Sequence, residues 1–229
     1  ERFMDAIQHN LEKCISSLGE KILKWPYNFF TESDAHSFLY YYIFRYGSKE
    51  IKGFYPTKDN HKTVLVHREY PTSFRFRKDD MKIYDDGGRG HYDLVVLNPN
   101  FIFNHNIKDV MAKEYKHCMT DCKDHILSAL EFKLITKPLD KNMKDEIKKD
   151  IIKLKMVIEQ GQTQTAYCLI FNRCREESDF VQELCIWGEQ NSEVKILYIE
   201  TVLKEKRHYL VKYINGWDYK NKYENGNCV

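Results

Sequence analysis

Apolar residues recur every three or four positions near the start of the chain, which predicts an amphipathic helix over residues 2–23. The apolar positions are Met4, Ile7, Leu11, Ile15, Leu18 and Ile22. A second helix is predicted to follow Thr31, because threonine is a good N-cap and Glu32 and Asp34 favour the positive end of a helix. Gly47 is expected to end it.

From residue 62 the pattern changes to short apolar and alternating runs, which are typical of strands. A strand is predicted over residues 62–70, interrupted by Pro71, and a second short strand over residues 73–77. A glycine-rich loop then leads into a strand that Asn98 and Pro99 close. Residues 101–103 are expected to extend this strand or to pair with it.

The second half of the chain alternates between the two periods. Helices are predicted over residues 107–127, 142–160 and 176–186, and strands over 129–135, 165–173, 194–200 and 208–214. This order indicates one α/β domain over residues 1–229, in which helices flank a mixed central β-sheet.

The composition narrows the function only slightly. The formal net charge is +2, from 36 basic and 34 acidic residues, so the overall charge does not indicate a polyanion ligand. Seven cysteines, several in apolar runs, favour reduced thiols and a cytoplasmic protein. We expect no membrane association, because no apolar stretch reaches 18 residues and the first residues lack the apolar core of a signal peptide.

Two opposite charges lie within one apolar strand, residues 129–135. Alternate residues of a strand share a face, so Glu131 and Lys133 project together while Phe132 projects oppositely. Such a pair by itself is usually a solvated pair on an edge strand. A second charged residue, Asp93, begins another apolar strand directly after the glycine-rich loop. Aspartate is depleted in strands, and a buried one needs a partner or a metal.

The segments Gly90-His91-Tyr92-Asp93 and Leu130-Glu131-Phe132-Lys133-Leu134 together resemble the PD-(D/E)XK nuclease superfamily, whose fold is restriction endonuclease-like. The resemblance covers about residues 30–172. It includes a preceding helix with an early acidic residue, Glu32, and a strand with a glutamate, Glu69. It also includes a helix and an apolar strand after the lysine. Tyr92 replaces the motif's proline, which the family tolerates.

The resemblance also predicts the boundaries of the core. The 37 residues from 94 to 130 are too many for a simple hairpin between the two strands, so a helical insertion is expected at about 104–127. Residues 173–229 are expected to form a C-terminal extension of a helix and strands.

The resemblance implies a nuclease that hydrolyses phosphodiester bonds in DNA with Mg²⁺, for which Mn²⁺ can substitute. Asp93, Glu131 and the main-chain carbonyl of Phe132 would bind the metal, with Glu69 or Glu32 as a further ligand. Lys133 would orient or help deprotonate the attacking water, or stabilise negative charge. Cleavage of both strands would suit a homodimer.

Two other interpretations remain open. One is a catalytically inactive domain of the same fold that serves in nucleic-acid binding or protein interaction. The other is an unrelated α/β protein in which residues 129–135 form an ordinary edge strand.

Basic residues in three places are candidates for binding the phosphate backbone. They are Arg75, Arg77 and Lys78 in one segment, Arg89 in the glycine-rich loop, and Lys137, Lys141, Lys144, Lys148, Lys149, Lys153 and Lys155 in and before the lysine-rich helix. For that helix, a solvated face interleaved with acidic residues is an equally good interpretation.

A zinc site is a weaker candidate. His117, Cys118, Cys122 and His125 lie close together in the predicted insertion. Structural zinc sites usually pair cysteines two residues apart in a turn, so a half-buried helix face is the favoured interpretation.

Overall fold

A six-stranded mixed sheet forms the centre of the molecule, with strand order β3-β4-β5-β6-β7-β8. The computed structural model describes residues 2–76, 88–111, 124–174, 178–202 and 208–214. The strands of this sheet are β3 (Val66–Phe76), β4 (Gly88–Leu97), β5 (Ile126–Ile135), β6 (Thr163–Asn172), β7 (Val194–Val202) and β8 (His208–Ile214). Strands β1 (Phe54–Pro56) and β2 (Lys62–Val64) form a separate antiparallel pair.

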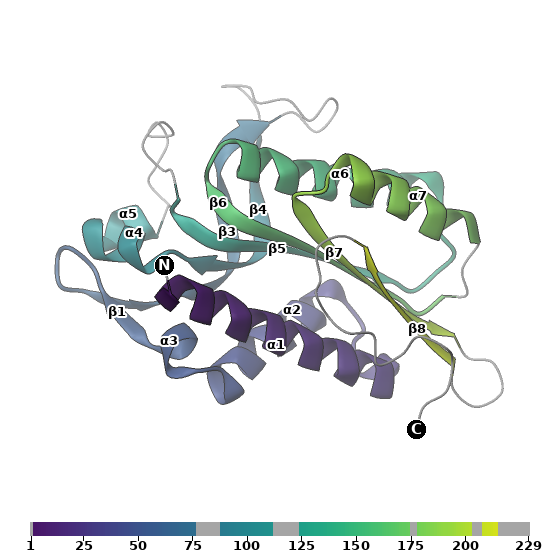
Figure 1. The fold of residues 1–229 in the computed structure, drawn as a ribbon, viewed down its shortest axis with the longest axis horizontal. Coiled ribbons are helices and arrows are strands. Elements are labelled where there is room, and N and C mark those ends of the chain that lie inside the picture. Colours follow the sequence, from purple (N-terminus) through teal and green to yellow (C-terminus); the bar gives the residue numbers. More distant parts are fainter. Residues whose placement is uncertain (1, 77–87, 112–123, 175–177, 203–207, 215–229) are drawn as a thin grey trace.

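Helices cover both faces of the sheet (Figure 1). One face carries α1 (Arg2–Lys24) and α2 (Glu32–Tyr46), and the opposite face carries α6 (Lys141–Glu159) and α7 (Ser178–Gln190). The shorter helices are the 3₁₀ helix η1 (Pro26–Asn28), α3 (Lys49–Lys52), α4 (Pro99–Asn104) and α5 (Ile107–Val110). The predicted fold class, a mixed sheet flanked by helices, is confirmed.

The two N-terminal helices follow the predicted pattern. Helix α1 buries Ile7, Leu11 and Leu18 along its predicted apolar stripe. Thr31 caps α2, because its hydroxyl oxygen accepts a hydrogen bond from the Asp34 amide while the Asp34 carboxylate accepts one from the Thr31 amide. These contacts fix the first turn of α2, which carries Glu32 to the central strand β5, where its Oε1 accepts a hydrogen bond of 3.4 Å from the Leu134 amide.

The order of strands brings the two charged segments together. Strands β3, β4 and β5 form an antiparallel meander, and α6 crosses over to place β6 parallel to β5. Leu94 of β4 pairs with Leu130 of β5, so Asp93 and Glu131 each lie next to this pair on adjacent antiparallel strands. The 37 intervening residues therefore leave the two strands side by side.

Four local predictions were wrong. The strand predicted over residues 62–70 is divided between β2 and β3, which belong to different sheets. Strand β3 continues through Pro71, with a register irregularity between Pro71 and Arg75 that accommodates the proline. Residues 101–103 lie in helix α4, whose N-cap is Asn98 and whose first residue is Pro99, an arrangement that favours a helix start. The predicted insertion helix is limited to α5 in its described part, because β5 already begins at Ile126; residues 112–123 lie outside the described residues.

Within the part of the chain that the structure describes, every helix is too short or too polar to cross a membrane.

Candidate metal centre

Asp93 lies on β4 where the regular pairing with β5 ends. Its Oδ2 accepts a hydrogen bond of 2.7 Å from the Phe132 amide, so the carboxylate takes the place of a main-chain acceptor. Phe132 stands between Glu131 and Lys133. The predicted aspartate is thus bonded directly to the strand segment that carries the other two predicted residues, and the Phe132 carbonyl stays a predicted metal ligand.

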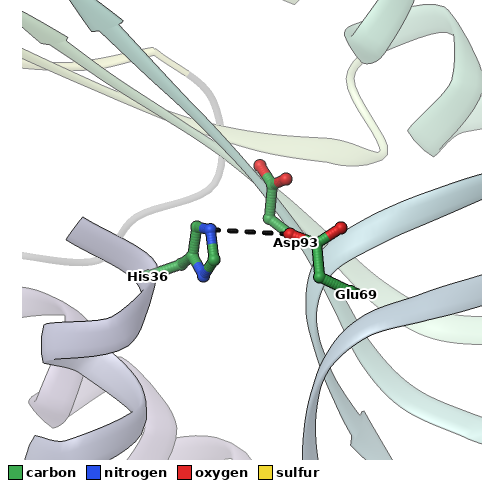
Figure 2. Close-up of side chains that lie close together, drawn as sticks. All are labelled: His36, Glu69 and Asp93. Atoms are coloured by element: carbon green, nitrogen blue, oxygen red, sulfur yellow. Dashed lines mark ion pairs between the residues drawn. The ribbon is translucent and has the colours of Figure 1, made fainter. Parts of the chain in front are cut away.

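Asp93 forms a cluster with side chains from two other elements (Figure 2). The cluster consists of His36 of α2, Glu69 of β3 and Asp93 itself, and one potential ligand atom from each lies within 4.8 Å of the others. His36 is buried, whereas the Glu69 side chain is 62% exposed. Two oxygen ligands of one Mg²⁺ can lie up to about 4.2 Å apart, because each is about 2.1 Å from the ion. Small side-chain movements would therefore bring these carboxylates into ligand distance.

Glu69 reaches this position because of an unusual backbone conformation. Its φ is 50°, a left-handed value that non-glycine residues adopt rarely and at a cost. Consecutive strand residues normally project to opposite faces. Here both Arg68 and Glu69 contact His36: the Arg68 Nε lies 2.9 Å from Nδ1, and the Glu69 Oε1 lies 3.7 Å from Nε2.

The contact with Arg68 decides which His36 nitrogen carries a hydrogen. Arginine Nε–H can only donate, so His36 Nδ1 accepts and the neutral ring carries its hydrogen on Nε2. Nε2 therefore presents a hydrogen toward Glu69 instead of a lone pair toward a metal. Burial lowers the pKa of His36, which favours this neutral form. We conclude that His36 orients the carboxylates, and that Asp93 and Glu69 are the groups suited to hold a cation.

The carboxylates nearest the sheet are costly to keep ionised. Burial raises the pKa of Asp93, against the opposing effects of the Phe132 amide and of His36. Burial also raises the pKa of Glu32, although Lys133 opposes the shift. A bound cation would favour the ionised form of both groups.

Glu131 is buried and is paired with a residue that sequence reasoning did not assign to it. Lys153 of α6 lies with its Nζ 2.6 Å from Glu131 Oε1, 3.3 Å from Asp150 Oδ1 and within 3.3 Å of the His91 carbonyl. Burial raises the pKa of Glu131 well above its usual range, and Lys153 acts against that shift. Lys153 is thus a buried counter-ion and not a surface residue free to bind phosphate.

Lys133 links the two helices that cover opposite faces. Its Nζ lies 3.0 Å from Asp150 Oδ2 of α6 and 3.6 Å from Glu32 Oε2 of α2. Burial alone would lower the pKa of Lys133, but the charges of Asp150 and Glu32 outweigh burial and raise it. Lys133 is therefore a stable cation at neutral pH.

Counting charges shows that this region is acidic. Five carboxylates face two ammonium groups and one guanidinium: Glu32, Glu69, Asp93, Glu131 and Asp150 against Lys133, Lys153 and Arg68. With every group ionised, the sum is −2. A divalent cation would neutralise the excess.

The predicted phosphate-binding residues are spread over the molecule. Lys144 pairs with Glu183 of α7 at 2.9 Å, and Lys148 lies over the Trp187 ring, so both face α7. Lys137 is exposed after β5, and Lys149 is half-buried on α6. Arg75 and Arg89 pair in the β3–β4 register, but their side chains, like the whole of Arg77, lie outside what the structure describes.

Sequence reasoning missed His36, Arg68 and Asp150 as members of the site, and it assigned Lys153 to phosphate binding. A signal for the last two existed, because the apolar stripe of Ile147, Ile151 and Leu154 runs beside positions 150 and 153. Nothing local indicated His36 or Arg68. Of the zinc candidates, His125 is buried before β5, and the other three lie outside the described residues.

Comparisons with protein-family models, with curated proteins and with solved structures found no match for this chain.

Proposed function

We propose that this chain is a divalent-metal-dependent nuclease that hydrolyses phosphodiester bonds in DNA. The observation that carries the proposal is the hydrogen bond from the Phe132 amide to Asp93, which joins the aspartate to the strand bearing Glu131 and Lys133. The order α2-β3-β4-β5-α6-β6 supports it, because this is the order of elements that the resemblance to the PD-(D/E)XK superfamily implies.

Asp93 and Glu69 are the residues that would hold Mg²⁺ or Mn²⁺. Magnesium is commonly bound by one or two carboxylates together with waters and substrate phosphates, and the two carboxylates of Asp93 and Glu69 match this coordination. The bound ion would supply charge neutralisation and an activated water. The resemblance assigns Glu131 as a ligand, yet the structure brings Glu69 instead into a cluster with Asp93. Glu131, paired with Lys153, would fix the local geometry of β5 beside Lys133.

Lys133 would act as a fixed positive charge. Its raised pKa makes it a poor base, so of the roles considered for it, charge stabilisation fits best. Asp150 and Glu32 hold its ammonium group beside the carboxylates. There it would offset the negative charge that develops on the phosphate during hydrolysis.

A specific observation favours the alternative of an inactive domain. Glu131 is already paired with Lys153 at 2.6 Å, and Lys133 with Asp150 at 3.0 Å, so the two strand charges form a closed network with α6. A domain of this kind would bind DNA or a protein without cleaving it. Binding of DNA together with the absence of any metal-dependent cleavage would favour this alternative.

The test is a cleavage assay. Purified protein incubated with supercoiled plasmid should nick or linearise it with Mg²⁺ or Mn²⁺ and not with EDTA. Lys133→Met, which keeps most of the length of the side chain but removes its charge, should lose at least about tenfold in rate. Asp145→Asn, an exposed position on α6, is the matched control. Equal rates for wild type and folded Lys133→Met would refute the role of Lys133.

A further inference from the structure

Arg68 on β3 combines exposure with a fixed orientation. Its Nε donates to His36 Nδ1 at 2.9 Å, and its Nη2 donates to Ser33 Oγ at 3.2 Å. Both partners belong to the first turns of α2. An exposed arginine usually keeps much rotamer freedom, and two bonds from one guanidinium to one helix remove most of it.

Neither of these partners carries a negative charge. Among the described residues, no carboxylate lies within ion-pair distance of the Arg68 guanidinium, although Glu69 is its neighbour in the chain. A guanidinium has five N–H donors, and the two bonds use two of them. Three donors and the full positive charge remain available on an exposed side chain.

The imidazole ring of His36 connects Arg68 to the proposed metal site. His36 accepts from Arg68 with Nδ1 and faces Glu69 with Nε2. The left-handed conformation of Glu69 makes this possible, because it places two consecutive strand residues against the same imidazole. The Arg68 guanidinium thus lies one imidazole ring away from the carboxylate cluster.

We propose that Arg68 binds a phosphate of the DNA backbone beside the metal site, with Ser33 and His36 as positioning residues. The planar fork of arginine matches two phosphate oxygens, and a fixed fork loses little entropy on binding. The inference rests on the proposed function for the identity of the ligand. It adds a substrate contact that does not depend on the metal.

The test measures binding separately from cleavage. A fluorescein-labelled 20-base-pair DNA duplex is titrated in EDTA at several salt concentrations, and fluorescence anisotropy gives the affinity. Arg68→Gln should weaken binding by about tenfold, the effect expected for the loss of a charged hydrogen bond. It should also reduce the slope of log affinity against log salt by about 0.9, the value for one phosphate contact.

Two variants serve as controls. Arg68→Lys should keep the salt slope yet bind more weakly than wild type, because it retains the charge and loses the fork. Arg45→Gln removes an exposed arginine from the far end of α2 and should change neither quantity. Thermal melts establish that each variant is folded.

The outcomes separate the two proposals. An Arg68→Gln variant with wild-type affinity and salt slope would overturn the phosphate contact, and so would a wild type that binds no DNA. A wild type that binds DNA through Arg68 but shows no metal-dependent cleavage would retain the contact and refute the nuclease.

Discussion

Two charged regions lie side by side on β4 and β5 and differ in how their charge is balanced. Around Asp93, the side chains of His36 and Glu69 approach but leave an unmatched carboxylate, and Glu69 is largely exposed. Around Glu131, the lysines and Asp150 form short ion pairs among buried and half-buried side chains. In the first region, the negative charge is not fully balanced and is open to solvent. In the second region, the opposite charges are nearly balanced and are shielded from solvent.

This difference in charge balance indicates a structural role for the second region and a binding role for the first. A buried ion pair seldom adds stability over apolar packing, but its disruption is costly, so the Glu131–Lys153 pair fixes the local geometry. An unmatched carboxylate next to solvent is a candidate for binding a cation. Loss of a partner in the second, buried region should therefore have the largest effect on stability.

Replacing Lys153 with methionine should be strongly destabilising. The change leaves Glu131 buried without its partner at 2.6 Å, and such a loss typically lowers the free energy of unfolding by about 3–5 kcal/mol. Chemical denaturation measures it. The double variant Lys153→Met/Glu131→Leu should recover most of the loss, since both charges are then gone. A cost below about 1 kcal/mol for the single variant would mean that the two regions do not differ.

Two substitutions of Glu69 should separate backbone strain from charge. Glu69→Gly relieves the left-handed conformation and should raise the free energy of unfolding by about 1 kcal/mol. Glu69→Gln keeps the strain and should leave stability unchanged, because the side chain is mostly exposed. Both should weaken Mn²⁺ binding. Stability that falls in Glu69→Gly would show that the carboxylate, and not the backbone, dominates at this position.

The smallest expected effect is a pH dependence from His36. Burial lowers its pKa in the folded state below the unfolded value of about 6.5. The stability from its neutral form is therefore present above about pH 6.5 and is lost as the pH falls through the folded value. The loss is at most about 1.4 kcal/mol per pH unit for one proton. In EDTA, the free energy of unfolding of wild type should fall more steeply below pH 6.5 than that of His36→Gln; parallel slopes would contradict this.

The helices and strands that surround the site could be predicted because their sequence signals are local. The amphipathic stripe of α1, the N-cap Thr31 and the apolar runs of β4 and β5 depend on neighbouring residues, and the structure has them all. The meander order then places Asp93 beside β5. These features can be predicted from the periodicity of apolar residues and from the conformational preferences of single residues.

The rest of the site depends on contacts that no local pattern contains. Lysine is rarely buried, so Lys153 was expected to face solvent on a helix full of lysines. Its partner Glu131 is distant in sequence. Glutamate seldom adopts positive φ, and nothing near Glu69 indicates a turn. The contact of Arg68 with His36 joins residues 32 positions apart, which only the packing of α2 on β3 determines.

The most direct test of the account is calorimetric titration of Mn²⁺ into wild type, Asp93→Asn and Asp145→Asn. Asparagine preserves an oxygen acceptor for the Phe132 amide while removing the negative charge, so the fold of Asp93→Asn should persist. The account predicts binding of Mn²⁺ to wild type and Asp145→Asn, and at least a tenfold loss in Asp93→Asn. Equal affinity of all three proteins, or no binding to wild type, would contradict a metal centre at Asp93.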